Sequence, residues 1–400
     1  MRQSAVLVGD AIASFPDSMN RRLPVVLLLI VCLGAALFAG TQVGSAKAPP
    51  APPAGFFGIA PQTELTDADV RYMKAGGIER VRWPMIWSAI QPTPKRTYEW
   101  AAFDPVVEVA ARRGLEVLPF IIDTPAWLSA KGTKLPVDSG KARSAWKAFL
   151  RAAVKRYGPG GEFWAEHAPG AVKPPVSVYE PETPVISRPL PIRDWQVWNE
   201  ANFHYFAFPV SPQRYVKLLK ISSPAIKEVD PGARVVLTGL FGKPTAGGAR
   251  GMPAAKFLEA IYRTPGIENL FDGIALHPYA VDAETLEELT EEIHEVTVEN
   301  EDPVALYVTE MGWGSQNNRR VVAFEQGIRG QVRQLRGAYR YLIDNQRRLN
   351  LKQVYWYSWK DLHGSCTFCD SVGFFYAGDN FHAKPAWRAF VGITRGRARP

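Results

Sequence analysis

Two glutamates stand at the ends of short apolar segments that have the composition of buried strands. Residues 195–200 are WQVWNE and end in Glu200, and residues 305–313 are ALYVTEMGW and contain Glu310. Burying a carboxylate without a partner is costly, so a glutamate at the end of a buried strand commonly belongs to a functional site. Two carboxylates that face each other beside aromatic rings are the groups that cleave a glycosidic bond. This pair is the leading candidate for chemistry in the chain.

The segments that must position these glutamates alternate between strand-like and helix-like composition, which is typical of a parallel sheet with crossover helices. The expected strands cover residues 56–59, 80–83, 116–122, 195–198, 234–238, 273–276, 305–309 and 353–359. The expected helices cover residues 65–76, 103–113, 139–156, 211–228, 253–263, 283–299, 320–347 and 384–391. This count predicts an α/β fold, a single (β/α)8 TIM barrel. An open, doubly wound sheet is the alternative, but no glycine-rich phosphate motif follows the first strand.

The residues before the barrel have a different composition. Residues 23–38 are an uninterrupted apolar run after Arg21 and Arg22, which is the order of a secretory signal or of an uncleaved membrane anchor. The domain limits that we expect are 1–48 for a signal peptide or N-terminal anchor, 49–54 for a linker, 55–392 for the catalytic barrel and 393–400 for a basic tail. The protein is then secreted, or it is held on the extracytoplasmic face of the cell membrane through residues 23–38.

Composition narrows the classes of partner. Of the 400 residues, 46% are hydrophobic and 22% are charged, as in a globular protein with a large core. The formal net charge is +8, but no basic stripe is interleaved with aromatic residues, so no nucleic-acid partner is expected. Twelve tryptophans, several of them at the ends of apolar strands, instead suggest a site on which sugars stack.

The cysteines suggest a disulfide rather than a metal site. Cys366 and Cys369 form a CxxC pair in a late loop, and Cys32 is the third cysteine. In an exported protein, a local disulfide is the leading interpretation of such a pair. A zinc site needs more ligands, and His363 and His382 stand at no recognised spacing. Without a nucleotide-binding motif, the sequence implies neither a metal nor an organic cofactor.

In a barrel, the carboxyl ends of the strands converge on one mouth, where active sites lie. Polar and aromatic side chains gather at those ends in this sequence, which packing alone does not require. They are Arg82 at strand two, Trp127 at strand three, Asn199 and Glu200 at strand four, His277 and Tyr279 at strand six, Glu310 and Trp313 at strand seven, and Trp359 at strand eight. The structural alternatives are an ordinary salt bridge for Arg82, a core position for His277 and barrel packing for Trp359.

Four motifs at these strand ends resemble a known group of enzymes. The order WxxWNE, LHPY, TEMGW and YWYSW at strands four, six, seven and eight is similar to that of retaining (β/α)8 glycoside hydrolases of clan A, with families 39 and 5 nearest. The likeness covers roughly residues 56–390. Asn-Glu at strand four combined with Thr-Glu at strand seven is specific, whereas either alone is weak. The family pattern often has proline after the first glutamate, where this chain has Ala201; this difference concerns loop geometry and leaves the carboxylate in place.

The resemblance makes Glu200 the acid/base and Glu310 the nucleophile, and it implies that Arg82 keeps Glu310 ionised. The expected function is a retaining β-glycosidase that hydrolyses O-glycosidic bonds in an oligo- or polysaccharide through a covalent glycosyl-enzyme. The expected partner is therefore a carbohydrate. Three alternatives stay open: a barrel that binds glycans without cleaving them, a cell-envelope scaffold, and a transglycosylase that uses the same site.

The resemblance also suggests roles for the remaining side chains. Asn199 is expected to donate to a sugar 2-hydroxyl, and Tyr279 to hydrogen-bond the nucleophile. His277 is expected to contact the sugar or to orient a carboxylate. Trp359 is expected to form the apolar floor of the −1 sugar site, with Trp127 and Trp313 as further walls.

Overall fold

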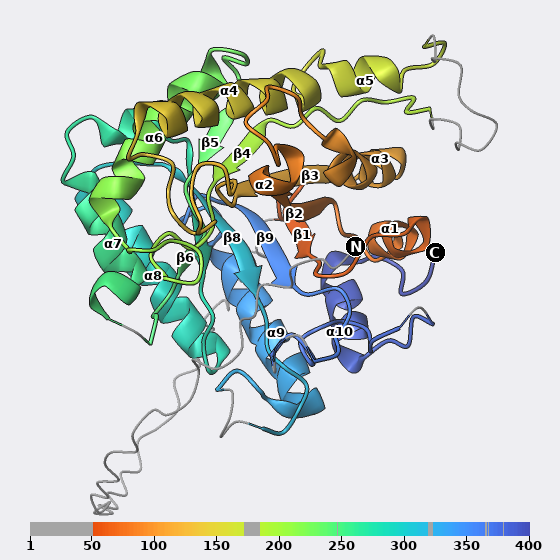
Figure 1. Cartoon of the computed structure of the whole chain (residues 1–400). Coiled ribbons are helices and arrows are strands. Elements are labelled where there is room, and N and C mark those ends of the chain that lie inside the picture. Colours follow the sequence, from red (N-terminus) through yellow and green to blue (C-terminus); the bar gives the residue numbers. More distant parts are fainter. Residues whose placement is uncertain are drawn as a thin grey trace, which may run out of the picture.

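The computed structural model describes residues 51–171, 185–245, 247–318, 323–364, 366, 368–378 and 380–400, and its strands close into a parallel barrel (Figure 1). The strands are β1 (Phe57–Ala60), β2 (Arg80–Ile86), β3 (Glu116–Ile122), β4 (Asp194–Val197), β5 (Arg234–Val236), β6 (Leu240–Phe241), β7 (Gly273–His277), β8 (Ala305–Met311) and β9 (Leu351–Tyr357). Strand β9 pairs with β1, and β5 pairs with both β4 and β7. Since β5 and β6 both pair with β7, together they fill one position, and the barrel has eight positions. The expected barrel fold is confirmed.

Helices follow the strands and form a layer around the barrel (Figure 1). They are α1 (Asp67–Ala75), α2 (Trp87–Ile90), α3 (Asp104–Arg112), α4 (Gly140–Tyr157), α5 (Glu162–Glu166), α6 (Pro212–Lys227), α7 (Ala254–Tyr262), α8 (Ala283–Glu299), α9 (Gly327–Asn345) and α10 (Pro385–Thr394). Four helices begin at capping side chains that accept a backbone N–H of the first turn, namely Thr66 before α1, Ser139 before α4, Ser211 before α6 and Asp282 before α8. Such caps set the start of a helix because they satisfy donors that lack an intrahelical partner.

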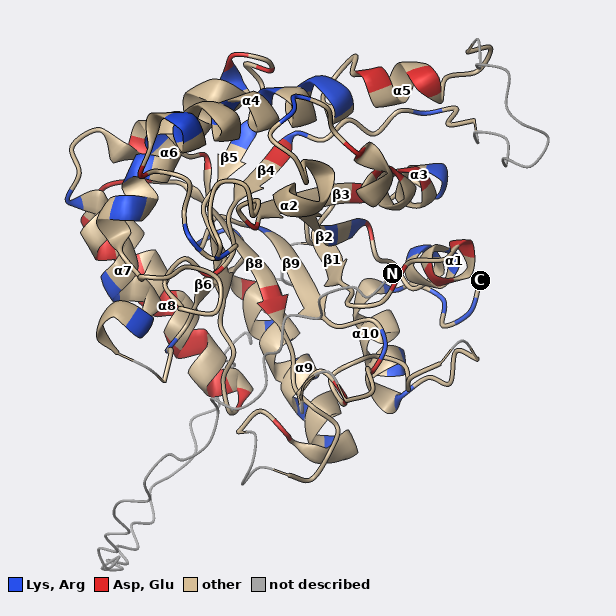
Figure 2. Ribbon diagram, in the orientation of Figure 1, with Lys and Arg blue, Asp and Glu red and all other residues tan. Residues whose placement is uncertain are grey.

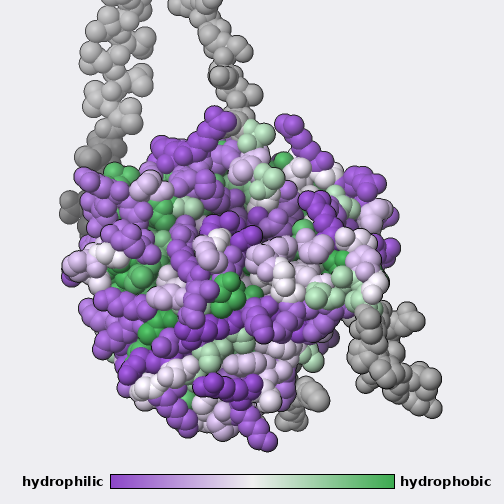
Figure 3. Space-filling model, turned by 90° about the horizontal axis from the view of Figure 1, so that it is seen from above, coloured by the Kyte–Doolittle hydropathy of each residue, from purple (hydrophilic) through white to green (hydrophobic). Residues whose placement is uncertain are grey.

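The core lies between the strands and the inner faces of the helices. Along α9, Leu335, Ala338, Tyr339 and Leu342 are buried, and their spacing of three and four residues places them on one face. The strands are buried on both sides, as expected for a parallel sheet covered by helices. Charged residues lie mainly on the helices and the outer loops, while most of the strand length is uncharged (Figure 2). On the face that lies uppermost in Figure 1, hydrophobic residues occur in small groups among hydrophilic ones (Figure 3).

The structure differs from the expected elements in several places. Strand β9 ends at Tyr357 rather than at residue 359, and helices α2 and α5 were not expected. The fifth barrel strand, expected over 234–238, is divided into β5 and β6 by residues 237–239, and this interruption matters for the site described below. Helix α9 begins at Gly327, whereas the pattern predicted a start near residue 320. The predicted signal peptide or anchor at 1–48, including the apolar run 23–38, lies outside the described residues. Within the described residues, no helix combines the length and apolar composition that crossing a membrane requires.

Candidate active site

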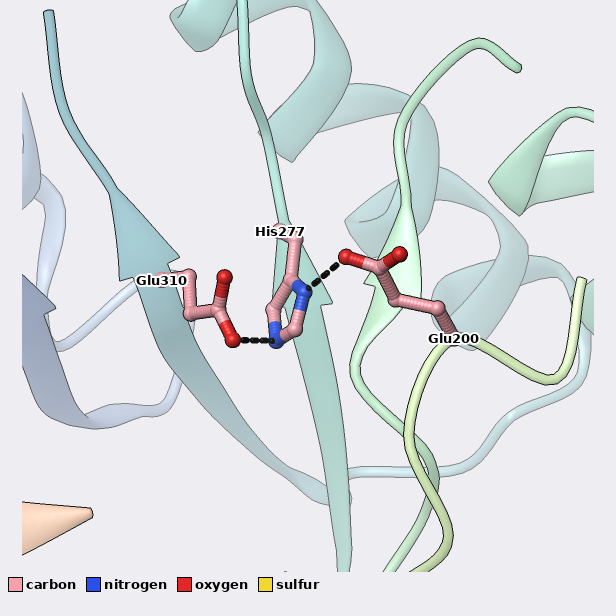
Figure 4. Close-up of side chains that lie close together, drawn as sticks. All are labelled: Glu200, His277 and Glu310. Carbon is pink, nitrogen blue, oxygen red and sulfur yellow. Dashed lines mark hydrogen bonds and ion pairs between the residues drawn. The ribbon is translucent and has the colours of Figure 1, made fainter. Parts of the chain in front are cut away.

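The carboxyl ends of the strands bring Glu200 and Glu310 together although 110 positions separate them in the sequence. Glu310 lies on β8 and Glu200 follows β4, and the imidazole of His277 on β7 lies between them (Figure 4). One oxygen of each carboxylate and one ring nitrogen of His277 all lie within 4.8 Å of one another. Retaining glycosidases hold their carboxyl groups about 5–5.5 Å apart, whereas inverting ones need about 6.5–9.5 Å to admit a water. The spacing in this structure fits the retaining geometry.

The backbone after β4 is bent so that Glu200 reaches the mouth. Trp198 and Glu200 have positive φ angles of 73° and 38°, a region that residues other than glycine seldom adopt. The Glu200 amide donates to the carbonyl of Gly239 at 3.0 Å, within the interruption of the fifth strand. A side chain at position 239 could not be accommodated, because its Cβ would lie 2.1 Å from Nε2 of His277. Unusual backbone of this kind tends to persist where a site requires it.

Arg82 on β2 donates hydrogen bonds to three side chains, one of which is Glu310. Its Nη1 donates to Oε1 of Glu310 at 2.5 Å, and its Nη2 donates to Oδ1 of Asn199 at 2.6 Å. Its Nε donates to Oε1 of Gln196 at 2.9 Å, and the guanidinium lies 3.9 Å from the ring centroid of Phe120. Arg82 is almost fully buried, so these contacts replace its hydration. Because Oδ1 of Asn199 faces Arg82, its amide nitrogen is the group that remains to donate to a ligand.

Glu310 is held through both of its oxygens. While Oε1 accepts from Arg82, Oε2 accepts the hydroxyl of Tyr279 at 2.8 Å. Burial and the nearby charge of Glu310 raise the pKa of Tyr279 well above its ordinary value, so this phenol stays a donor. The expected contact between Tyr279 and the second glutamate is therefore present in the structure.

Glu200 has a different environment. Its hydrogen-bond partner is the imidazole of His277, whereas the partner of Glu310 is the guanidinium of Arg82. Nδ1 of His277 lies 2.7 Å from Oε1 of Glu200, and Nε2 lies 3.0 Å from the hydroxyl of Thr309. Burial raises the pKa of Glu200 well above its ordinary value, the charge of Glu310 raises it further, and Arg82 opposes the shift. Burial, together with Arg82, lowers the pKa of His277 well below its ordinary value. The site thus favours the protonated form of Glu200 and the uncharged form of His277.

By distance, Glu200, His277 and Glu310 could also hold a metal ion, and they are the one such group among the described residues. Their hydrogen bonds fit that use poorly. Oε1 of Glu310 already accepts from the cation Arg82, and the ring nitrogens of His277 face Glu200 and Thr309. A metal ion would have to displace these contacts and lie beside a buried guanidinium. The arrangement therefore fits proton transfer by a carboxyl group better than metal binding.

Comparisons with known proteins bear on the fold that carries this geometry. No protein-family model matches the chain, and no curated protein matches it. A family 39 glycoside hydrolase from Bacteroides cellulosilyticus WH2 superposes with a TM-score of 0.59 at 19% identity, over 84% of this chain and 63% of that one. An exo-β-1,4-mannosidase from Opitutaceae bacterium strain TAV5 superposes with a TM-score of 0.56 at 15% identity, over 85% of this chain and 59% of that one. A monomeric β-xylosidase from Caulobacter crescentus CB15 superposes with a TM-score of 0.54 at 17% identity, over 86% of this chain and 68% of that one.

This chain has the barrel fold of glycoside hydrolases. The likeness predicted from the four motifs thus extends to the three-dimensional structure. At identities of 15–19% the comparisons concern the fold alone, and the chain spans less than two thirds of the first two structures.

The tryptophans expected to line the site are placed differently from the prediction. Trp359 is fully buried, donates to Oδ1 of Asp69 on α1 at 2.8 Å, and packs against the rings of Phe375 and Trp387. It therefore cannot form the floor of a sugar site, and that expectation is wrong. The chain turns after β9 ends at Tyr357, so the strand alternation on which a side-chain direction depends no longer applies two residues later.

The other two expected walls differ from each other. Trp313 is also buried and donates to the carbonyl of Ala280 at 2.8 Å, so it supports the loop after β7 and offers no surface to a ligand. This expectation is wrong as well. Trp127 is partly exposed, donates to the carbonyl of Gln91 at 3.0 Å, and has Nζ of Lys141 5.6 Å from its ring centroid, so its role as a wall of the site stays a prediction.

The sequence reasoning missed Tyr357, the last residue of β9. Its ring meets that of Tyr279 edge to face at 6.1 Å, and burial followed by the charges of Glu310 and Glu200 raises its pKa well above the ordinary value. Its hydroxyl lies 3.3 Å from Sγ of Cys369, which is bonded to Cys366 as the CxxC spacing suggested. The aromatic residue that ends β9 was the available signal for this position.

Proposed function

We propose that the protein is a retaining β-glycosidase that hydrolyses O-glycosidic bonds by double displacement. The observation that carries this proposal is the unequal treatment of two adjacent carboxyl groups. Glu310 accepts hydrogen bonds from a cation and a phenol, while burial and its partner's charge raise the pKa of Glu200. Two carboxyl groups whose environments push their pKa values apart can act as nucleophile and acid.

In the first step, the carboxylate of Glu310 attacks the anomeric carbon of the bound sugar. The bond to the glycosidic oxygen breaks, and Glu200 transfers its proton to that oxygen so that the leaving group departs as an alcohol. Asn199 is positioned by Arg82 to donate its amide to the sugar 2-hydroxyl, a contact that strengthens in the transition state. The product of this step is a glycosyl ester on Glu310.

The second step returns the enzyme to its starting state. Once Glu310 is esterified its negative charge is gone, so the charge that raised the pKa of Glu200 no longer acts. Glu200 can then accept a proton from water while the water oxygen attacks the anomeric carbon and releases Glu310. If another sugar hydroxyl takes the place of water, the same step gives transglycosylation.

A direct test is to trap the intermediate. The purified protein is incubated with 4-nitrophenyl β-xyloside, β-glucoside and β-mannoside, chosen because the similar structures include a β-xylosidase, a glucosidase and a mannosidase. We expect release of nitrophenol from at least one of them. The matching 2-deoxy-2-fluoro glycoside should then inactivate the enzyme and add the mass of one sugar to the peptide that contains Glu310. A label on another residue would disprove the assignment.

The same experiment separates the alternatives. A barrel that binds glycans without cleaving them, or a scaffold, would release no nitrophenol and take up no label. A transglycosylase would become labelled and would give longer products when an acceptor sugar is added.

We also propose that the protein is exported, on the basis of the apolar run 23–38 and the two arginines before it. Expression of the full chain, cell fractionation and N-terminal sequencing of the product test this. A mature terminus near residue 49 would indicate a cleaved signal, and an intact terminus in the membrane fraction would indicate an anchor. Recovery of the full-length protein in the cytoplasm would contradict the proposal.

A further inference from the structure

The connection between β9 and α10 folds back over the end of β9 beside the two glutamates. The amide of Leu362 donates to the carbonyl of Cys369 at 3.1 Å, and the amide of Asp370 donates to that of Cys366 at 3.0 Å. The Cys366–Cys369 disulfide closes this part of the loop, and Sγ of Cys369 lies 3.3 Å from the hydroxyl of Tyr357. The mechanism proposed above makes no use of this closed loop.

Phe368 stands directly before the second cysteine of the loop, and its ring is fixed against two tyrosines. It lies parallel to the ring of Tyr357, with centroids 5.9 Å apart and an interplanar angle of 4°. It meets the ring of Tyr279 edge to face at 5.5 Å and 88°. Since Tyr279 donates to Oε2 of Glu310, Phe368 is separated from the proposed nucleophile by a single aromatic ring.

A third ring completes the group. Phe324 lies 5.8 Å from Tyr279 and 5.7 Å from Phe368. Tyr279, Phe324 and Phe368 are each partly exposed and their rings contact one another, and Tyr279 is hydrogen-bonded to Glu310. We call these three residues the aromatic wall. Partly exposed rings in contact beside a reacting group match the apolar C–H face of a pyranose, because both surfaces gain by leaving water.

We propose that Phe368 is a specificity-determining residue, that the aromatic wall binds the C–H face of a neutral sugar ring at Glu310, and that the disulfide holds Phe368 in place for this purpose. The inference rests on the proposed glycosidase function and adds a ligand surface to it. The closed loop fixes Phe368 before the sugar arrives, so less side-chain and loop freedom is lost on binding. Charged groups on the sugar face that meets the wall are disfavoured, since three rings cannot replace their hydration.

The first test compares Phe368→Ala with Phe381→Ala. Phe381 is a matched control because it is partly exposed, belongs to the same connection, and stacks on Tyr72 at 4.1 Å, outside the contacts of the aromatic wall. With the 4-nitrophenyl glycoside that the wild type cleaves best, Phe368→Ala should raise KM and lower kcat/KM on the order of tenfold. Phe381→Ala should stay within about twofold of wild type. Phe368→Trp should retain most of the wild-type kcat/KM because it keeps a flat ring.

A binding measurement separates this proposal from the proposed function. In a Glu310→Gln background, titration calorimetry with xylotetraose, cellotetraose and mannotetraose should show weaker binding when Phe368→Ala is added. If no variant hydrolyses any glycoside but this difference persists, the glycosidase function fails and the wall stands. If binding is unchanged and only kcat or its pH profile moves, Phe368 merely positions Tyr279, and the proposal is overturned.

The disulfide is tested by reduction. Tris(2-carboxyethyl)phosphine converts the bond between Cys366 and Cys369 into two thiols, and it should lower kcat/KM of the wild type severalfold, mainly through KM. A Cys366→Ser/Cys369→Ser double variant should show the lowered value from the start and no response to the reductant. Equal activity of reduced and oxidised wild type, with reduction verified by thiol titration, would contradict the role given to the disulfide.

Discussion

The two ends of the barrel each hold an ionic cluster to which β2 and β4 contribute, yet the charges of the two clusters are balanced differently. At the amino ends, Asp194 at the start of β4 accepts from Nε of Arg234 at 2.5 Å and lies 3.5 Å from Nη1 of Arg80. The amide of Gln353 adds a further bond at 2.9 Å. One deeply buried carboxylate is thus met by two arginines, one of which also contacts the half-exposed Glu116.

At the carboxyl ends the ratio is reversed. Arg82 is the cation that acts on the two carboxyl groups there. It donates a hydrogen bond to Glu310, whereas on Glu200 it acts through its charge alone. The partner of Glu200 is His277, which burial keeps neutral. Two buried carboxyl groups therefore share one positive charge.

The difference shows why one cluster is structural and the other suits chemistry. Where cations match or exceed the buried carboxylates, the charges are satisfied and the cluster fixes the strands. Where carboxyl groups exceed cations, both cannot ionise freely, so one holds a proton that can be transferred. This division agrees with the general rule that barrel enzymes keep their active sites at the carboxyl ends of the strands.

The sharpest way to test the carboxyl-end cluster is Glu310→Gln. The amide keeps the shape and can still accept from Arg82, but it cannot attack an anomeric carbon. We expect kcat to fall by a factor on the order of 10⁴ or more, because a nucleophile is lost outright. Steady-state kinetics and circular dichroism check this, with the far-ultraviolet spectrum unchanged. Near-normal turnover by a natively folded variant would refute the nucleophile assignment.

Glu200→Gln removes the transferable proton and leaves the nucleophile. A loss of roughly 10²–10⁴-fold in kcat/KM is expected for a poor leaving group such as an alkyl alcohol. The loss should be much smaller for 2,4-dinitrophenolate, which departs without protonation. In the wild type, activity should fall as the pH rises through the raised pKa of Glu200. In a Glu200→Ala variant, added azide should partly restore the activity. An equal loss for both leaving groups would remove Glu200 from the acid role.

Much of this organisation could be predicted from the sequence. Parallel strands buried on both faces are continuous apolar runs, so all eight barrel positions stood out, and the polar residues that end those runs marked the mouth. Glu200, Glu310, Arg82 and Tyr279 were singled out in this way. The division of the fifth strand was not predicted, because Leu237 continues the apolar run and only Gly239 signals a break.

The partners that tune the site could not be predicted in the same way. Arg82 and Glu310 are 228 positions apart, and only closure of the barrel decides which groups Arg82 also meets. Gln196 could have been suspected as a polar residue inside an apolar strand. Trp359 was misplaced because a side chain beyond the end of a strand follows the turn of the chain rather than the alternation of the strand.

The two arginines of β2 offer a matched comparison between the two ends. Arg82→Met should lower kcat/KM by roughly 10²-fold, because Glu310 loses a charged donor that is aligned with it in the resting site. Arg80→Met should leave kcat/KM within about twofold but reduce the free energy of unfolding by about 1–3 kcal/mol, since Asp194 keeps Arg234 as a partner. Kinetics and urea unfolding of both variants decide this. If Arg80→Met impaired catalysis as strongly as Arg82→Met, the proposed separation between the two clusters would be wrong.

The smallest effect concerns the pH dependence of stability. The folded protein raises the pKa of Glu200 above its ordinary value of 4.5, so it binds this proton more tightly than the unfolded chain does. The contribution of Glu200 to stability is therefore fully present below the ordinary pKa and is lost as the pH rises through the raised one. Glu200→Gln lacks this titration, so the free energy of unfolding of wild type relative to the variant should decrease from acidic to alkaline pH. Urea unfolding of both proteins across this range measures the difference, and parallel curves would mean that the two carboxyl groups at the barrel mouth are not in competition for one positive charge.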